Sequence, residues 1–147
     1  MDRGYRVHPL RLDKALQAYS LIHLAEPHFR ADEWAELVAS AHRWLIISLE
    51  DATGYVRGLA AYRIEKHPVA GELMDVPIFL AASVIDDVAI AEKMFAALRK
   101  KSAECRYMRV WTNLPRNFAE MENEDKFLRW DHGLMVKIDR KPSPALL

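Results

Sequence analysis

The sequence predicts one α/β (α+β) domain, residues 1–140, followed by a loose tail at 141–147. Its core is expected to be a mixed, mostly antiparallel, twisted sheet of about six strands flanked by helices. The first reason is size, because 147 residues, 51% of them hydrophobic, suit one domain with one core. The second is that apolar runs typical of strands alternate with segments of helical periodicity. The third is a late strand, helix and strand in succession, which indicates a right-handed parallel crossover. The expected order is β-α-α-β-β-β-α-β-α-β.

A short strand and two helices are predicted in the first third of the chain. The strand covers residues 5–7 and ends before Pro9. A helix that ends before Pro27 follows, because apolar residues recur there at helical spacing: Leu12, Ala15, Leu16, Tyr19 and Ile22. A second helix is expected to begin near Asp32, which suits an N-cap. Its predicted buried face is Trp34, Leu37, Val38 and Ala41.

Three strands are predicted in the middle of the chain. Residues 44–47 are a continuous apolar run, as expected of a strand covered on both faces. Residues 55–65 return antiparallel to it after a turn, and residues 72–81 form the third strand after another turn. Pro77 lies inside this third strand. Because proline cannot donate to a strand ladder, it predicts a bulge or an unpaired edge position.

Two helices and two strands complete the predicted fold. Asp86 stands at the start of the first of these helices, where aspartate suits an N-cap. The predicted buried stripe of this helix is Val88, Ala91, Phe95 and Leu98. A strand at 107–111, a helix at about 123–132 and a final strand at 134–138 follow.

Composition excludes several classes of protein. Lysine plus arginine and aspartate plus glutamate number 21 each, so no bulk charge favours nucleic acid or an acidic membrane. The basic run 99–101 closes a predicted helix, where cations suit the dipole. Cys105 is the only cysteine, which excludes an intramolecular disulfide and favours a reducing, cytoplasmic location. The most apolar window, 76–85, is too short to cross a bilayer.

A late segment supplies a recognisable motif. Asn123 opens the last predicted helix, Trp130 follows seven residues later, and Gly133 and Leu134 lead into the final strand. With the element order and the proline-interrupted strand, this segment resembles the GNAT superfamily of N-acetyltransferases, over about residues 5–140. In that family an Asn opens the helix, a Tyr follows at the same spacing, and Gly-Phe starts the strand. The resemblance implies a GNAT-like three-layer fold with a bulge in its fourth strand.

The family's most diagnostic motif is Arg/Gln-x-x-Gly-x-Gly/Ala, at the start of the helix after the fourth strand. Glycines there let backbone N–H groups approach a pyrophosphate, and the long side chain adds a donor. In this chain Asp86 stands at the Arg/Gln position, Asp87 at a frequent glycine, and Ala89 and Ala91 at the small positions. Like charges about 6 Å apart repel by roughly 3 kcal/mol at an effective dielectric of about 20, so the two carboxylates disfavour pyrophosphate. Alternatively, one of the two aspartates is only an N-cap.

The resemblance implies acetyl-CoA, or another acyl-CoA, as cofactor, bound in a splayed gap between the strands at 72–81 and 107–111. Backbone N–H groups near residues 81–83 would polarise the thioester carbonyl. The cofactor-binding residues implied in this way are Ala81, Ala82, Ser83, Val88, Ala89, Ile90, Ala91 and Asn123.

Candidate catalytic residues lie on the two strands beside that gap. Glu72 or Asp75 could act as general base, directly or through water. Alternatively, both are solvated residues at a strand edge. Trp130 stands where the family has a Tyr that acts as general acid, and an indole cannot protonate a thiolate at neutral pH. Tyr107 is therefore the candidate phenol. Cys105, with no neighbouring histidine, is expected to be a small buried hydrophobe.

Two functions are consistent with this sequence. The first is an acyl-CoA-dependent N-acyltransferase, in the simplest case an acetyltransferase, in which an amine of a small molecule or a protein attacks the thioester directly. The second is a non-catalytic GNAT-like module that binds another ligand or a protein and has lost CoA binding. A homodimer is a further expectation, because the late strands are strongly apolar. The histidines match no zinc pattern, so we expect no metal site.

Overall fold

The computed structural model describes residues 4–40, 43–83, 86–111 and 133–138. Six strands in these ranges form one sheet in chain order: β1 (Arg6–Pro9), β2 (Leu45–Glu50), β3 (Val56–His67), β4 (Gly71–Ala81), β5 (Tyr107–Trp111) and β6 (Gly133–Lys137). The helical elements of the same ranges are η1 (Leu12–Lys14), α1 (Ala15–Ala25), α2 (Ala31–Ala39) and α3 (Asp87–Lys101). Neighbouring strands are antiparallel except β4 and β5, which are parallel. The predicted mixed, mostly antiparallel sheet is confirmed.

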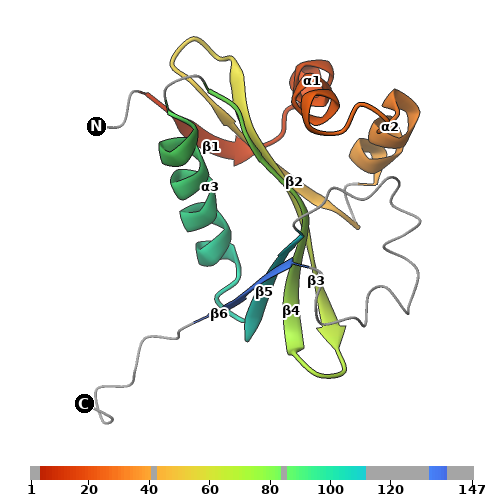
Figure 1. Cartoon of the computed structure of the whole chain (residues 1–147), viewed down its shortest axis with the longest axis vertical. Coiled ribbons are helices and arrows are strands. Elements are labelled where there is room, and N and C mark those ends of the chain that lie inside the picture. Colours follow the sequence, from red (N-terminus) through yellow and green to blue (C-terminus); the bar gives the residue numbers. More distant parts are fainter. Residues whose placement is uncertain (1–3, 41–42, 84–85, 112–132, 139–147) are drawn as a thin grey trace.

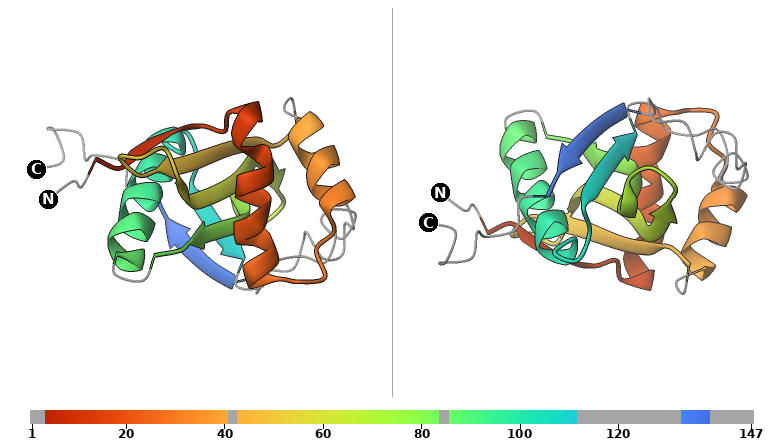
Figure 2. Two further views of the ribbon diagram at one scale, coloured as in Figure 1. Left: turned by 90° about the horizontal axis from the view of Figure 1, so that it is seen from above. Right: turned by 90° about the horizontal axis from the view of Figure 1, so that it is seen from below.

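The sheet lies between two helical layers (Figures 1 and 2). Helices α1 and α2 cover one face, which we call the α1/α2 face, and α3 covers the other, the α3 face. The apolar cluster on the α1/α2 face includes Phe29, Leu59 and Ile78. The cluster on the α3 face includes Val76 and Met108. Because successive strand residues point to opposite faces, the sheet contributes side chains to both clusters. This is the three-layer arrangement that the sequence predicted.

Helix α1 buries only part of its apolar surface against the sheet. The chain first makes a 3₁₀ turn at η1, and α1 begins at Ala15. Its buried side chains are Ala18, Leu21 and Ile22. Leu12 and Leu16, which share the helical spacing with the buried Ile22, are 79% and 83% exposed. They line a groove of about 350 Å³ between α1 and α2 instead.

Helix α2 begins at Ala31, with Arg30 in the N-cap position. Asp32, the predicted N-cap, therefore lies inside the first turn, where its carboxylate accepts a hydrogen bond from the Arg30 guanidinium at 3.0 Å. Trp34 and Leu37 are buried as predicted. The Trp34 indole also donates to the Ala15 carbonyl at 2.8 Å, which fixes α2 against α1.

Helix α3 packs on the sheet through one stripe, spaced four residues apart. The buried members are Ile90, Met94 and Leu98. Of the predicted stripe, Leu98 is correct, Val88 is 66% exposed, and Ala91 and Phe95 are only half-buried. The predicted basic run 99–101 does close the helix.

Gly58 of β3 explains which stripe is buried. A Cβ atom at residue 58 would lie 2.3 Å from Met94 Sδ, 3.1 Å from Ile90 Cγ2 and 3.2 Å from Leu49 Cβ. The helix therefore approaches β3 closely because residue 58 has no side chain. The contact places the first turns of α3 next to β3.

Some expectations fall outside the described residues. They are the helix at 123–132, the domain end at residue 140 and the tail at 141–147. Among the residues that the structure does describe, no helix is long and apolar enough to span a membrane.

Candidate functional site

Strands β4 and β5 pair over only part of their length. Their register joins residues 73–76 to residues 107–110. Beyond Val76, β4 continues to Ala81 and pairs, among the described residues, with β3 alone. Strand β5 ends at Trp111, which pairs with β6. The two strands therefore separate after the 76–110 pair, and we call this opening the fork.

A bulge at Pro77 marks the start of the fork. In the register of β3 and β4, residues 61 and 63 face residues 78 and 75, so β4 has one extra residue there. Val76 and Pro77 of β4 stand opposite Tyr62 of β3. Pro77 lacks the N–H that a regular ladder would use, and a bulge bends the strand that contains it. The bulge predicted from the sequence is confirmed.

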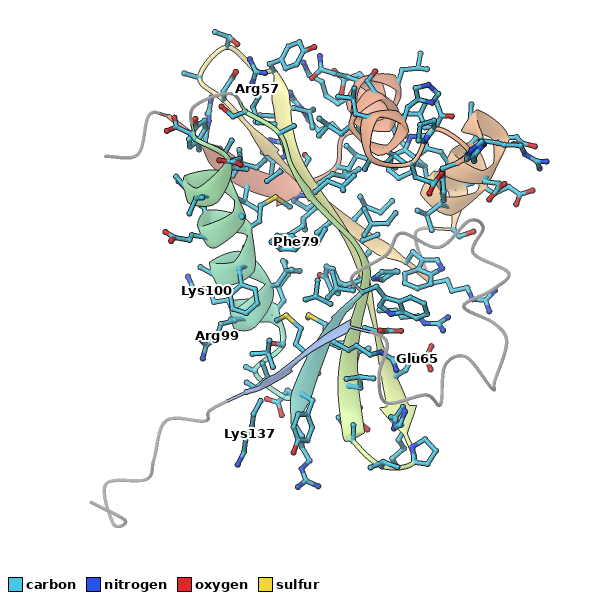
Figure 3. All side chains as sticks on the ribbon, in the orientation of Figure 1. Arg57, Glu65, Phe79, Arg99, Lys100 and Lys137 are labelled. Carbon is cyan, nitrogen blue, oxygen red and sulfur yellow. The ribbon has the colours of Figure 1, made fainter. Side chains whose placement is uncertain are left out.

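Beyond the bulge, β4 presents backbone groups to the fork. The Ala82 N–H donates to the Arg57 carbonyl at 2.8 Å, on the β3 side. Because successive residues in a strand direct their N–H and C=O groups to opposite edges, those of Phe79 and Ala81 point away from β3. The Phe79 side chain itself packs with the cluster on the α3 face (Figure 3). An extended ligand in the fork would meet the backbone of residues 79 and 81.

Three side chains meet at the apex of the fork, and we call them the clasp. Both oxygens of the Asp75 carboxylate accept from Arg109, Oδ1 from Nε at 2.9 Å and Oδ2 from Nη2 at 3.1 Å. The Trp111 indole Nε1–H donates to Asp75 Oδ1 at 2.7 Å. The Arg109 guanidinium also lies 5.5 Å from the centroid of the Trp111 ring. Asp75 and Arg109 are fully buried.

The N-terminus of α3 carries two carboxylates. Asp86 occupies the N-cap position, but its side chain makes no cap hydrogen bond and accepts the Tyr5 hydroxyl at 2.7 Å instead. The Asp86 N–H donates to Ser83 Oγ at 3.2 Å. Asp87 Oδ1 accepts from the Val88 N–H at 3.0 Å. Acceptors of the protein itself therefore occupy part of the helix terminus that would attract an anion.

No protein-family model and no curated protein sequence matches this chain. Solved structures do match its fold. An aminoglycoside antibiotic 6′-N-acetyltransferase from Acinetobacter baumannii has a TM-score of 0.62 at 13% identity, over 95% of this chain and 100% of that one. The GNAT family N-acetyltransferase YhbS from Escherichia coli, solved in complex with CoA, has a TM-score of 0.55 at 13% identity, over 74% of this chain and 62% of that one. This chain has the GNAT fold.

A transcriptional regulator from Bacillus halodurans also matches the fold of this chain, with a TM-score of 0.66 at 10% identity, over 92% of this chain and 99% of that one. A fold of this kind does not by itself determine an activity, so any function must be argued from the site.

The GNAT fold separates the predicted catalytic residues from one another. Glu72 is exposed at the paired end of β4, on the α3 face like Met74. Tyr107 is half-buried at the corresponding end of β5 and points to the α1/α2 face, so Glu72 and Tyr107 do not face each other. Asp75 lies beside the apex but has no exposed surface. The expectation that Asp75 is a solvated edge residue is therefore wrong.

The described residues predicted to bind the cofactor lie at the open end of β4 and at the start of α3. The open end of β4 contains Ala81, Ala82 and Ser83, all half-buried. The start of α3 contains the exposed Val88 and Ala89, the fully buried Ile90 and the half-buried Ala91. The Ile90 N–H donates to the Asp86 carbonyl at 2.9 Å, so neither it nor the Ile90 side chain is open to a ligand. Asn123 lies outside the described residues.

Arg109 and Trp111 were not predicted as partners of Asp75. The sequence did contain a signal for the Arg109 contact. An arginine in the middle of an apolar strand needs a carboxylate partner, and Asp75 lies on a neighbouring strand. Cys105 is buried as expected. Burial, followed by the charges of Glu72 and Glu104, raises the pKa of its thiol, which disfavours a nucleophilic thiolate.

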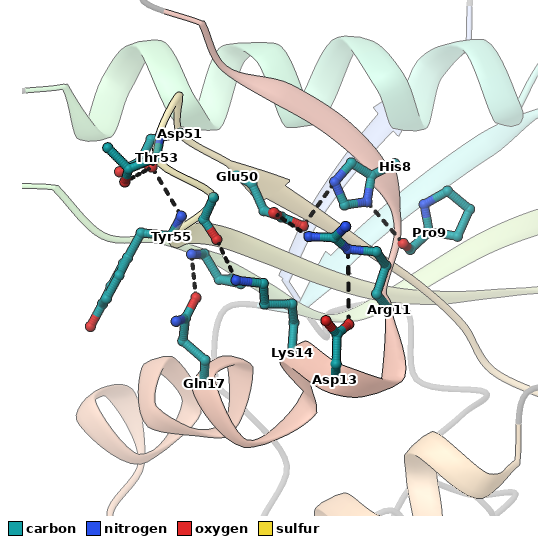
Figure 4. Close-up of polar contacts among 12 residues, drawn as sticks. His8, Pro9, Arg11, Asp13, Lys14, Gln17, Glu50, Asp51, Thr53 and Tyr55 are labelled. Carbon is teal, nitrogen blue, oxygen red and sulfur yellow. Dashed lines mark hydrogen bonds and ion pairs between the residues drawn. The ribbon is translucent and has the colours of Figure 1, made fainter.

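A second polar cluster lies at the edge of the sheet formed by β1 and β2 (Figure 4). Glu50 is buried there, and its Oε1 accepts from Arg11 Nη2 at 2.9 Å, while His8 Nε2 lies 2.8 Å from its Oε2. With Arg6 and Pro9 these residues line a cavity of about 360 Å³. The ion pairs join η1 to β1 and β2, and strands β3 and β4 separate them from the fork. In the described part of the chain, no group of three or more His, Cys, Asp or Glu residues is arranged to hold a metal ion.

Proposed function

We propose that the chain is an N-acyltransferase that uses an acyl-CoA, in the simplest case acetyl-CoA, and transfers the acyl group to an amine by direct attack. The observation that carries this proposal is the fork, where the backbone of Phe79 and Ala81 lies on a strand edge that pairs with no other strand in the described part of the chain. Such an edge binds an extended chain through main-chain hydrogen bonds, and the arm of CoA is an extended chain with two amide groups. A neighbour with this fold, YhbS, was solved with CoA. The bound cofactor would supply the activated thioester.

The backbone of β4 has a defined part in this proposal. An N–H group that points at the developing oxyanion stabilises it. The Ala82 N–H is engaged by Arg57, so the donors on the fork side are the N–H groups of Phe79 and Ala81. The small side chain of Ala81 leaves its backbone accessible to a ligand.

The acid and the base remain proposals as well. These roles for Glu72 as base and Tyr107 as acid would require the amine and the thiolate to reach the paired end of β4 and β5, where the two side chains point to opposite faces. Each role has a test. Glu72→Gln and Tyr107→Phe should lower the transfer rate by about 10²- to 10⁴-fold without weakening donor binding. Equal transfer rates in parent and variant would remove that residue from the mechanism.

A non-catalytic GNAT-like module is the second candidate function, and the N-terminus of α3 favours it. Asp86 and Asp87 put two negative charges at the helix start where the GNAT resemblance places the pyrophosphate of the cofactor. The Asp87 carboxylate also accepts the Val88 N–H, which is then not available to a ligand. In such a module the fork would bind a different extended ligand or a protein segment.

Donor binding distinguishes the two candidates. Acetyl-CoA at 100 times its Kd should stabilise the native chain by about 2.7 kcal/mol, which is a rise in Tm of roughly 5–10 °C for a domain of this size. Ala81→Pro removes the N–H that faces the fork without touching the ladder to β3, so it should abolish the rise. The absence of any rise for the parent at several millimolar acetyl-CoA would refute the transferase.

The carboxylates of the helix terminus can be tested separately. The double variant Asp86→Arg, Asp87→Gly removes both negative charges and restores a donor, so it should bind CoA about 100-fold more tightly than the parent. Asp13→Arg, an exposed charge change at η1, should leave CoA affinity unchanged. Equal affinities of the double variant and the parent would show that the repulsion is not what limits binding.

The acyl acceptor, the cellular location and the oligomeric state belong to the proposal as well. We propose a small-molecule or protein amine as acceptor, a cytoplasmic location and a homodimer. Because the A. baumannii neighbour is an aminoglycoside acetyltransferase, an aminoglycoside is the first amine to test, with a polyamine and a lysine peptide beside it. Release of free thiol measures transfer, and sedimentation equilibrium measures the dimer.

A further inference from the structure

The clasp stands where the fork begins. Asp75 faces Arg109 directly in the parallel register, one position before the last pair of β4 and β5. Trp111 is the first residue of β5 beyond that last pair. Its indole nevertheless reaches back to Asp75 across the gap between the strands. The Asp75 carboxylate therefore connects the closed part of the sheet to the first residue of the open part.

The surroundings of Asp75 do not suit a general base. A base needs an oxygen within hydrogen-bond reach of the proton it takes. Both Asp75 oxygens already accept hydrogen bonds from Arg109, Oδ1 accepts a further one from Trp111, and the residue has no exposed surface. Any effect of Asp75 on a ligand in the fork must act through the groups it holds.

Stability alone does not explain the clasp. A buried ion pair is weak evidence for stability, because desolvation offsets much of the attraction, and an apolar pair of similar volume is often neutral or stabilising. What the apolar pair could not do is hold the Trp111 indole, which needs an acceptor for its Nε1–H. Arg109 over the indole ring adds a second restraint on the same side chain.

We propose that Asp75 is a positioning residue that fixes the apex of the fork. Through Arg109 it locks the last paired residues of β5 to β4, and through the indole of Trp111 it sets the direction in which β5 departs. The width of the opening beside the residues 78–81 then follows from this one carboxylate. The role of the fork as a donor site rests on the proposed function, but the mechanical role of the clasp does not.

The experiment is amide hydrogen exchange on the ligand-free chain, read residue by residue. Trp111→Phe removes the indole donor and keeps the buried ion pair. The double variant Asp75→Leu, Arg109→Met replaces the pair with apolar side chains and so avoids an unpaired buried charge. Trp44→Phe is the matched control, since Trp44 is buried on the same face beneath the Arg63 guanidinium and has no bond to Asp75.

We expect amide exchange to accelerate only near the apex of the fork. In both clasp variants, exchange should accelerate roughly tenfold or more at Val76, Ile78 and residues 110–111 relative to residues 73–74 and 107–108, as loss of a charge-assisted hydrogen bond implies. Trp44→Phe should leave that ratio unchanged. A uniform acceleration along both strands, or none at the apex, would overturn the proposal and leave the clasp as a packing feature.

Ligand binding adds an independent readout. If the parent is stabilised by acetyl-CoA, Trp111→Phe should raise the Kd about tenfold, and the Asp75 double variant should do the same. An unchanged Kd in both variants would show that the clasp does not position the donor site, even if the exchange result is local. If the parent does not bind acetyl-CoA, the proposed transferase fails, while the exchange experiment still decides the mechanical role.

Discussion

Gly58 provides the sharpest test of how α3 is positioned. Gly58 has an ordinary strand conformation, because the glycines with positive φ in the described residues are Gly4, Gly54 and Gly71. An alanine at residue 58 is therefore not strained in its backbone. If no packing contact opposed it, Gly58→Ala should stabilise the chain by about 0.4–1 kcal/mol through the unfolded state. Any loss of stability must come from the new methyl group.

The structure gives the size of that loss. The added Cβ would lie 2.3 Å from Met94 Sδ, which must move, and 3.1 Å and 3.2 Å from Ile90 Cγ2 and Leu49 Cβ. All three neighbours are fully buried, so none can turn into solvent. Overpacking of this kind costs about 1–3 kcal/mol, which exceeds the gain from the unfolded state. We therefore expect Gly58→Ala to be less stable than the parent by about 1–2 kcal/mol.

A double-mutant cycle identifies the cause. Urea unfolding at 25 °C followed by circular dichroism gives the free energy of unfolding of the parent, Gly58→Ala, Met94→Ala and the double variant. Met94→Ala alone should cost about 2–5 kcal/mol, because it leaves a cavity. In its background Gly58→Ala should be neutral or stabilising, a coupling of about 1–3 kcal/mol. Two results would refute the inference that Gly58 allows α3 to approach β3 closely. One is that Gly58→Ala is as stable as the parent, and the other is that it lowers the free energy of unfolding equally in both backgrounds.

Two further predictions concern turns. The pKa of Asp51 is lowered to about 2, chiefly by the hydrogen bond from the Thr53 hydroxyl at 2.6 Å. Since this lies below the unfolded value of about 3.9, the carboxylate stabilises the fold above about pH 4 and loses that effect as the pH falls toward 2. Urea unfolding should show Asp51→Asn less stable than the parent at pH 7, with the difference shrinking in acid; a constant difference would contradict it. In the β3–β4 turn, His67 Nδ1 accepts the N–H groups of Val69 and Ala70 at 3.1 and 3.2 Å. His67→Ala should cost about 1–3 kcal/mol in the same assay, and His67→Asn less, because its carbonyl restores an acceptor; equal costs would argue against the bonds.

The strands were easier to predict than the helix faces. A strand within this sheet needs only an apolar run and a turn, and Pro77 inside such a run left two readings, a bulge or an unpaired edge position, of which the structure has the bulge. A helix with apolar residues on several sides offers more than one face to the core. Leu16 and Ile22 fit one spacing, yet the sheet buries Ile22 while Leu16 lines the groove beside α2. In α3 the choice of Ile90 over Val88 depends on a glycine more than 30 residues earlier, which local spacing cannot reveal.

The separation of β4 and β5 was predictable in position, whereas the hydrogen bonds around it were not. The gap between two named strands followed from the family resemblance, and the structure has an opening there. The state of each carboxylate, however, depends on distant partners. Asp75 is saturated by an arginine 34 residues later, and Asp86 accepts a hydroxyl from Tyr5, 81 residues earlier. A sequence places a carboxylate on an element, whereas its availability for chemistry is set by tertiary contacts of this kind.

The fork and the helix terminus provide different information about function. The fork begins at a bulge, and we propose that the buried clasp positions its apex; neither feature depends on what occupies the opening. Among the described residues, the fork therefore leaves one edge of β4 without a strand partner, and this feature does not select CoA. The helix terminus is exposed, and Asp87 could change without disturbing the core. Its hydrogen bond to the Val88 N–H redistributes the negative charge and does not remove it, so repulsion of a pyrophosphate persists while one donor is also lost. If the chain does bind acyl-CoA, most of the affinity must come from the strand edge, and Ala81→Pro should then weaken binding far more than any change at Asp87.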